Sequence, residues 1–333
     1  MKSREIRLVR RPVGAPTPED FSVESVTVPP PAEGEVQVCN LWMAVDPAMR
    51  GRMSDAKSYV PPFELDKAME GPAIGEVVAS NDEAFVPGDL VFNRLGWREA
   101  FNAPASALQK RDRDALPAKA YLGFAGPTGL TAYAGLLRIG GLKPGDVVFV
   151  SAASGGVGSI ACQIAKLKGH KVIGSAGGEQ KAAFLRDELK LDGVIDYKAE
   201  PSLTKALARA APEGIDLYFD NVGGDHLQAA LAVANDKARF AICGMISQYN
   251  VTDAPTVPRN LTMLMVKSIR MEGFIVLNHM DLWQHFMADV TAWHKAGLLT
   301  QADTIYEGID RSLEAFFGLF SGNNLGRSLV KLA

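Results

Sequence analysis

The sequence predicts a two-domain α/β protein, in which a doubly wound parallel sheet is joined to a small, irregular β-barrel. Its length of 333 residues suits two domains of roughly 150 residues each. Short β-rich runs broken by proline occupy the N-terminal third. From Gly126 onward, short apolar strands alternate with helices, which is typical of a doubly wound sheet.

The N-terminal part carries β-rich runs at residues 35–38, 74–78 and 89–92. Prolines mark the turns between such runs, as at residues 29–31 and 61–62. Short strands separated by such proline turns favour an irregular barrel over a wound sheet.

The middle of the chain begins with residues 147–150, a fully apolar run of the kind expected for a buried parallel strand. A glycine-rich turn follows, and residues 160–167 then have a helical pattern that ends at Gly169. The alternation continues with strands at 171–174, 194–196, 216–220, 239–242 and 269–272, and with helices at 180–190 and 225–234.

The C-terminal part changes again, with a short helix at residues 312–320 and a last strand at 327–332. We expect this tail to return to the first domain, so that the active-site cleft lies between the two domains. The predicted domains are therefore residues 1–124 together with 301–333, and residues 125–300.

Composition excludes several classes of protein. Lysine and arginine total 35 and aspartate and glutamate total 38, so the net charge of −3 offers no global attraction to nucleic acid or to an anionic membrane. Cys39, Cys162 and Cys243 are scattered singly, which indicates neither a disulfide framework nor a zinc knuckle. No stretch approaches about 18 uninterrupted apolar residues. We therefore expect a soluble, cytoplasmic protein without a nucleic-acid or membrane partner.

A glycine-rich turn, Ser-Ala-Ala-Ser-Gly-Gly-Val-Gly at residues 151–158, lies between a predicted strand and a predicted helix. Glycines there let backbone N–H groups approach a pyrophosphate, and the helix N-terminus adds about half a positive charge. Ala153 takes the place of the first glycine of the G-x-G-x-x-G pattern. The context still predicts a dinucleotide-binding, Rossmann-type domain. The residues predicted to hold its cofactor are Ser154, Gly155, Gly156, Val157 and Gly158.

The end of the second strand indicates which dinucleotide is bound. An NAD site requires an acid there to bind the ribose 2′-hydroxyl. Here residues 174–178 contain no acid, and Lys181 follows at the start of the next helix. A lysine in this position can bind a 2′-phosphate, so NADPH/NADP is favoured over NAD(H). The alternative is that Lys181 is only a solvated charge of the helix.

These motifs together resemble the medium-chain dehydrogenase/reductase superfamily, and within it the zinc-independent alkenal and prostaglandin reductase branch, which includes the curcumin reductase-like, NADP-dependent oxidoreductases. The resemblance covers essentially the whole chain. Besides the glycine-rich turn and residues 174–181, it rests on residues 45–53, 126–133, 196–198, 220–224, 243–250 and 324–327. The family usually carries lysine where this chain has Arg327.

The resemblance implies a GroES-like β-barrel domain, a Rossmann domain and a homodimer joined through the strand near Ile269. It implies that Lys181 and Tyr197 bind the adenosine ribose and its 2′-phosphate beside Gly177, with Asn221 near the cofactor. Asn324 would reach the nicotinamide from the tail. The residues implied to flank the nicotinamide are Cys243, Gly244, Ile246, Ser247, Tyr249, Phe274 and Val276.

A metal is not expected. The position that resembles a Gly-His-Glu ligand motif is Met69-Glu70-Gly71, and Cys39 precedes the expected ligand region. The histidines show no ligand spacing.

Without a metal, the favoured chemistry is hydride transfer to the β-carbon of an α,β-unsaturated aldehyde or ketone, which forms an enolate. The enolate oxygen needs a hydrogen-bond donor, and Tyr249 is the candidate. A tyrosine hydroxyl can serve without giving up its proton. Tyr59, in residues 58–62, is a second candidate that would line the substrate site. Both tyrosines could instead be packing residues.

Three further hypotheses stay open at this stage. An NADPH:quinone reductase would share the fold, the cofactor and the lack of metal. A noncatalytic NADPH-binding protein is disfavoured because Lys181, Tyr197 and Tyr249 occur together. Alcohol oxidation with NADP is permitted by the resemblance, but the missing metal makes it the weaker interpretation.

Overall fold

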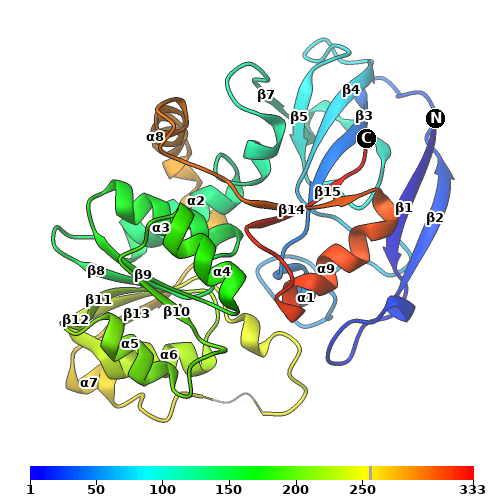
Figure 1. Cartoon of the computed structure of the whole chain (residues 1–333). Helices are drawn as coiled ribbons and strands as arrows, with labels where there is room; N and C mark the ends of the chain where they lie inside the picture. The colour runs from blue at the N-terminus through cyan, green and yellow to red at the C-terminus, as the bar shows by residue number, and fades with distance from the viewer. Residues whose placement is uncertain (255–256) are drawn as a thin grey trace. The chain divides into compact units, whose positions relative to one another are not determined.

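The computed structural model describes residues 1–254 and 257–333. It divides into two compact units, which are Met1–Leu122 with Asp303–Ala333, and Gly123–Ala302 (Figure 1). Each unit has its own sheet.

The second unit is built on a six-stranded sheet in the order β10-β9-β8-β11-β12-β13, in which every neighbouring pair is parallel. Counted from β8, this is the 3-2-1-4-5-6 order of dinucleotide-binding folds. The predicted doubly wound sheet is therefore confirmed. Its strands are β8 (Val147–Val150), β9 (Lys171–Ala176), β10 (Gly193–Asp196), β11 (Ile215–Asp220), β12 (Ala234–Ile242) and β13 (Arg270–Gly273). Its helices are α2 (Pro127–Ala134), α3 (Gly156–Leu167), α4 (Glu179–Ala183), α5 (Leu203–Ala210), α6 (Gly224–Val233), α7 (Met263–Val266) and α8 (Trp283–Lys295).

Alternation along the strands buries both faces of this sheet. Phe149, Tyr218 and Phe240 point to the face covered by α5 and α6 and form one core with them. Phe219 points to the other face, where the turn after α2 lies so close that a Cβ at Gly135 would come within 2.4 Å of its ring. Helices α2 and α3 pack together on that side (Figure 1). Strands buried on both faces explain the uninterrupted apolar runs of the sequence.

The first unit is built on a seven-stranded sheet rich in antiparallel pairs, in the order β14-β15-β3-β4-β5-β7, with β6 pairing β3. A separate antiparallel pair, β1 and β2, completes it. Its strands are β1 (Lys2–Leu8), β2 (Phe21–Thr27), β3 (Glu35–Ala44), β4 (Ala73–Ser80), β5 (Leu90–Asn93), β6 (Ala100–Pro104), β7 (Gln109–Arg111), β14 (Asp303–Glu307) and β15 (Arg327–Lys331). Its helices are α1 (Met49–Arg52) and α9 (Ser312–Ser321).

The C-terminal strand β15 is anchored in this unit by Arg327, whose side chain is 6% exposed. Its guanidinium forms a bidentate pair with the carboxylate of Asp46, and Nη2 lies 3.1 Å from Oδ2. Nε also donates to the carbonyl of Leu122 at 2.8 Å, and Nη1 donates to the carbonyl of Val45 at 3.2 Å. One side chain thus connects β15 to the residues that follow β3 and to Leu122, the last residue of the N-terminal part of this unit.

We predict that Arg327→Lys lowers the free energy of unfolding by about 2 kcal/mol. A lysine ammonium cannot reach both carboxylate oxygens of Asp46 and the carbonyl of Leu122, so buried acceptors lose their donors. Equilibrium urea unfolding measures the change. The control is Arg113→Lys at the exposed pair with Glu76, where we expect less than about 0.5 kcal/mol. Equal effects in the two variants would contradict the anchoring role of Arg327.

Candidate cofactor and active site

The carboxyl ends of β8 and β11 lie side by side at the centre of the parallel sheet, where the strand order reverses. Ligands of doubly wound folds bind at this point. Asp220, the last residue of β11, is fully buried there. Its Oδ1 accepts hydrogen bonds from Ser151 Oγ at 3.1 Å, Tyr218 Oη at 2.7 Å, and the backbone N–H groups of Val222 and Gly223 at 2.8 Å each. One oxygen therefore holds the ends of both strands.

Asn221 completes the connection between the two strand ends. Its backbone N–H donates to Ser151 Oγ at 2.9 Å, and its Nδ2 donates to the carbonyl of Ser151 at 2.7 Å. Burial raises the pKa of Asp220 above its ordinary value, although four hydrogen bonds oppose that effect. Its Oδ2 has no partner among the described residues.

The glycine-rich turn leads from β8 into α3, a helix of 12 residues whose N-cap, Gly155, offers no side chain to cap it. Its free N–H groups and the helix dipole suit an anion. A Cβ at Gly158 would lie 2.2 Å from the carbonyl oxygen of Ala152, so no side chain fits there. Ala153, at the first glycine position of the pattern, is accommodated by Gly174 in β9, since a Cβ there would come within 2.8 Å of the Ala153 methyl.

The predicted 2′-phosphate residues meet at the end of β9. Gly178, with φ of 98°, turns the chain into α4, which carries Lys181. The hydroxyl of Tyr197 lies so close that a Cβ at Gly177 would be 2.7 Å from it. Lys181 is half-buried, and its ammonium has no hydrogen-bond or ion-pair partner in the described part of the chain. Burial, and then the nearby charge of Lys198, lowers the pKa of Lys181.

The ring of Tyr197 is supported by His226, whose centroid lies 5.0 Å away in an edge-to-face arrangement. Burial lowers the pKa of His226 to about 4, so the imidazole is neutral at pH 7. A neutral ring adds no charge to the side chains predicted to bind the 2′-phosphate.

The segment after β12 folds back onto the end of β11. The N–H groups of Cys243 and Gly244 donate to the Asp220 carbonyl at 2.9 and 3.1 Å. The N–H of Ile246 donates to the backbone carbonyl of Asn221, and Ser247 Oγ donates to the backbone carbonyl of Val222 at 2.6 Å.

Tyr249 ends this segment, and its hydroxyl would be 3.0 Å from a Cβ at Gly244. The hydroxyl therefore faces the backbone beside the strand ends. Burial raises the pKa of the Cys243 thiol to about 12, so this cysteine is a packing group rather than a nucleophile.

Phe274 follows β13, and its N–H donates to the carbonyl of Ile242 at 3.3 Å. It packs edge-to-face against Phe219 of β11, while Val276 two residues later is only partly buried. The structure thus gathers the predicted residues of the second unit along the carboxyl edge of one sheet.

Two predicted residues belong to the first unit. Tyr59 is 56% exposed and lies between α1 and β4. Asn324 lies between α9 and β15, where its Nδ2 donates to the carbonyl of Gly326 at 3.1 Å. A role for Tyr59 in substrate binding and for Asn324 in cofactor binding stays a prediction.

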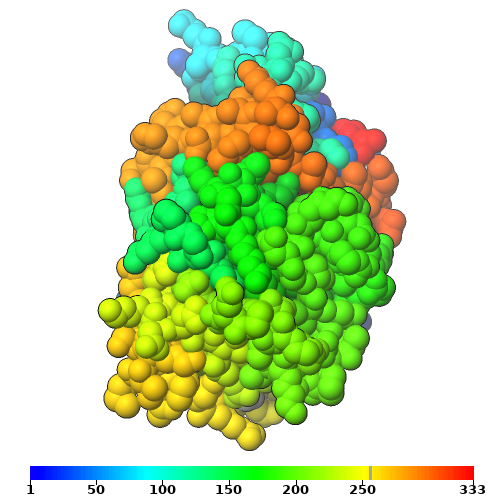
Figure 2. Space-filling view, turned by 60° about the vertical axis from the view of Figure 1, so that its left-hand side comes forward, coloured from blue at the N-terminus to red at the C-terminus, as the bar shows by residue number. Residues whose placement is uncertain are grey.

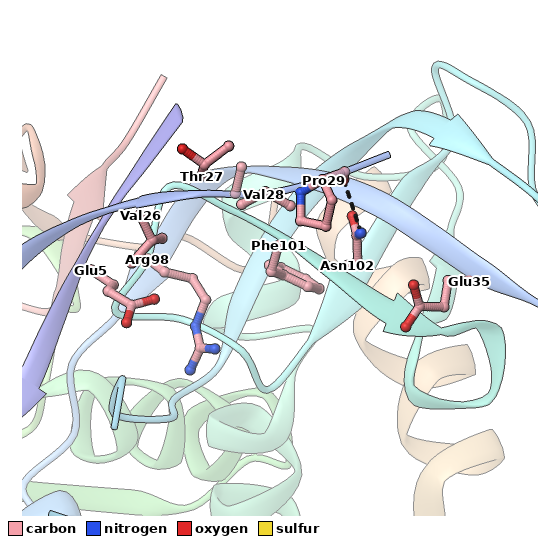
Figure 3. Close-up of a pocket in the computed structure, with 10 residues that line it drawn as sticks. Glu5, Val26, Thr27, Val28, Pro29, Glu35, Arg98, Phe101 and Asn102 are labelled. Atoms are coloured by element: carbon pink, nitrogen blue, oxygen red, sulfur yellow. Dashed lines mark hydrogen bonds between the residues drawn. The ribbon is translucent and has the colours of Figure 1, made fainter. Parts of the chain in front are cut away.

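A cavity of about 340 Å³ lies in the first unit, beside the end of β2 and the start of β6 (Figure 3). Val28 and Phe101 form apolar walls, and Arg98 lies at one end, where its Nη2 donates to the carbonyls of Ala68 and Met69. None of the predicted site residues lines this cavity.

Sequence reasoning missed the roles of Ser151, Asp220 and His226. Asp220 lies within a motif that the sequence singled out, but its partners come from distant positions, which only the strand pairing reveals. The position of His226 carries no signal, because its contact with Tyr197 depends on how α6 follows β11.

Within residues 1–254 and 257–333, no group of three or more His, Cys, Asp or Glu side chains is arranged to hold a metal ion. None of the helices in the same described ranges is both long and apolar enough to cross a membrane.

The strand order and the uncapped glycine turn define a dinucleotide-binding domain. Residues 156–292 match the family described as zinc-binding dehydrogenase, and residues 4–110 match the N-terminal domain of oxidoreductase. The protein YfmJ of Bacillus subtilis is 46% identical over 99% of this chain and 98% of its own length. The NADP(+)-dependent 2-alkenal reductase of Nicotiana tabacum is 38% identical over 100% of this chain and 98% of its own length.

Among solved structures, CurA from Vibrio vulnificus in complex with NADPH has a TM-score of 0.94 and 40% identity, and 99% of each chain is covered. This chain therefore belongs to the medium-chain dehydrogenase/reductase superfamily and, within it, to the alkenal and prostaglandin reductase branch. The family prediction from the sequence is confirmed.

We predict that Asp220→Ala lowers the free energy of unfolding by at least about 2 kcal/mol, because four donors at the strand ends lose their acceptor. Asp220→Asn keeps one acceptor oxygen and removes a charge that burial disfavours. Its amide replaces an Oδ2 that already has no partner. We therefore expect a change within about 1 kcal/mol of wild type by denaturant unfolding at pH 7. Equal losses in both variants would show that the charge itself is required.

Proposed function

We propose that this protein is an NADPH-dependent reductase that saturates the C=C bond of α,β-unsaturated aldehydes and ketones. The observation that carries the proposal is the half-buried Lys181 after the end of β9, which has no partner within residues 1–254 and 257–333, in a sheet with dinucleotide-binding strand order. The names of the alkenal reductase and the NADPH-bound relative support the same chemistry.

The residues of the second unit fit NADPH from end to end. The N–H groups at the start of α3 suit the pyrophosphate, and Gly158 lets this helix start close against the carbonyl of Ala152. Lys181 and the Tyr197 hydroxyl suit the 2′-phosphate. Cys243, Gly244 and Phe274 follow the carboxyl ends of β12 and β13, the position that we assign to the nicotinamide. When bound, NADPH supplies a hydride.

Tyr249 is assigned to the reaction because its hydroxyl stands beside Gly244 at the strand ends. In enone reduction the β-carbon gains a hydride, negative charge develops on the carbonyl oxygen, and a proton from solvent finally reaches the α-carbon. The hydroxyl of Tyr249 donates a hydrogen bond to that oxygen while the charge develops. It stabilises the enolate without transferring its own proton.

The test is to follow cofactor oxidation by the purified protein with a panel of enals, enones and quinones, using NADPH and NADH in parallel. We expect NADPH-selective turnover of the enones and a saturated carbonyl product. Turnover of quinones alone would replace the proposal with a quinone reductase. NADPH binding without any turnover would indicate a noncatalytic NADPH-binding protein.

Tyr249→Phe extends this test to the enolate donor. We expect kcat for an enone to fall about 10- to 1000-fold, because one oxyanion donor is lost, with little change in the Kd for NADPH. An unchanged kcat would show that Tyr249 is only a packing residue.

We also propose a homodimer formed through β13. This edge strand has all four residues exposed, and exposed Met265 and Met271 lie beside or within it. Figure 2 shows the yellow to orange segment that contains α7 and β13 at the surface of the second unit. An open parallel edge flanked by apolar side chains suits a second copy of the same strand about a twofold axis.

We predict that light scattering gives the mass of a dimer at micromolar concentration and that Met271→Lys shifts it to a monomer, since the charge is buried on pairing. The control is Val86→Lys, an exposed apolar residue of the first unit, which leaves the mass unchanged. A wild-type monomer would contradict the proposal.

We infer a cytoplasmic location from the cysteines. All three, Cys39, Cys162 and Cys243, are free thiols, and burial raises the pKa of each. Unpaired thiols suit a reducing compartment.

A further inference from the structure

The carboxyl ends of β9 and β10 bring a second lysine to the predicted 2′-phosphate position. The two strands are parallel, with Asp196 opposite Ala176, so the residues that follow each strand are neighbours. Asp196 Oδ1 accepts from the N–H of Gly178 at 2.7 Å and from the N–H of Lys198 at 3.0 Å. These two bonds fix the backbone of Lys198 beside the turn that leads to Lys181.

The side chain of Lys198 turns toward that site. A Cβ at Gly177 would lie 3.0 Å from Lys198 Cε and 2.7 Å from Tyr197 Oη, so both side chains pack across the same glycine. The ammonium of Lys198 therefore accompanies the tyrosine hydroxyl assigned to the phosphate.

Neither lysine has a counter-ion in the part of the chain that the structure describes. Neither ammonium has a hydrogen-bond or ion-pair partner among residues 1–254 and 257–333, and the charge of Lys198 acts unfavourably on Lys181. The acids that neighbour them in sequence are engaged elsewhere, because Glu179 pairs with Arg186 at 2.8 Å and Glu200 pairs with Arg209 at 2.6 Å. Two mutually repelling cations at a strand end suit a ligand group with close to two negative charges.

We propose that Lys198 is a second cation of the 2′-phosphate site and determines, together with Lys181, the preference for NADPH over NADH. The inference rests on the proposed function and extends it from one lysine to a pair that shares a single phosphate. The two cations repel each other in the free protein and in a complex with NADH alike, so only the 2′-phosphate relieves this repulsion, and the pair favours NADPH while leaving the affinity for NADH unchanged.

The experiment measures Kd for NADPH and NADH by cofactor fluorescence in the absence of substrate, for wild type, Lys198→Gln, Lys181→Gln and the double variant. We expect Lys198→Gln to weaken NADPH binding about 5- to 30-fold and to leave NADH within about twofold. Competition by 2′,5′-ADP should weaken in parallel, while competition by 5′-AMP should not. Lys198→Arg should recover most of the preference.

The matched control is Lys205→Gln, which removes the same charge from the exposed face of α5 in the same unit and should leave both constants unchanged. Equal weakening of NADPH and NADH in Lys198→Gln would show a structural effect and overturn the proposal. An unchanged ratio would overturn it as well. Wild-type protein that binds both cofactors equally would instead overturn the proposed cofactor preference itself, so the two failures are distinguishable.

Discussion

The candidate site depends on one buried carboxylate oxygen, Oδ1 of Asp220. It accepts hydrogen bonds from the end of β8 through Ser151 and from the turn after β11 through Val222 and Gly223. The carbonyl of the same residue receives the N–H groups of the segment that leads to Tyr249. Three chain segments that are distant in sequence are therefore held at the reversal of strand order, where a dinucleotide bridges the two halves of the sheet.

Around this centre, glycines leave space that the side chain of another residue would fill. Gly158 lets α3 start close against the carbonyl of Ala152, and Gly177 leaves room for the side chains of Tyr197 and Lys198. Gly174 makes the space that Ala153 occupies, so the departure from the G-x-G-x-x-G pattern is compensated in the neighbouring strand. The charge that remains at the end of β9 is positive and has no partner among the residues that the structure describes, which is consistent with the proposed binding of a phosphorylated ribose.

The sequence predicted the doubly wound sheet because its strands are buried on both faces and appear as apolar runs. It placed the helix after the glycine turn at residue 160, whereas α3 begins at Gly156, because glycines conceal a helix start. β1 was missed because its buried Ile6 and Leu8 stand among charged residues. Lys181 could be proposed from the sequence because the chemistry of that position is local, and its role stays a prediction. The contacts of Asp220 could not be predicted, since its donors are supplied by strand register.

The central claim is that the protein transfers a hydride from NADPH to the β-carbon of an enone, and isotope tracing tests it most directly. NADPH carrying deuterium at the transferable position of the nicotinamide C4 is oxidised with a simple enone in ordinary water, and the product is examined by NMR and mass spectrometry. The account predicts a saturated ketone with deuterium on the β-carbon and a solvent proton on the α-carbon. Deuterium on the carbonyl carbon of an allylic alcohol would contradict it.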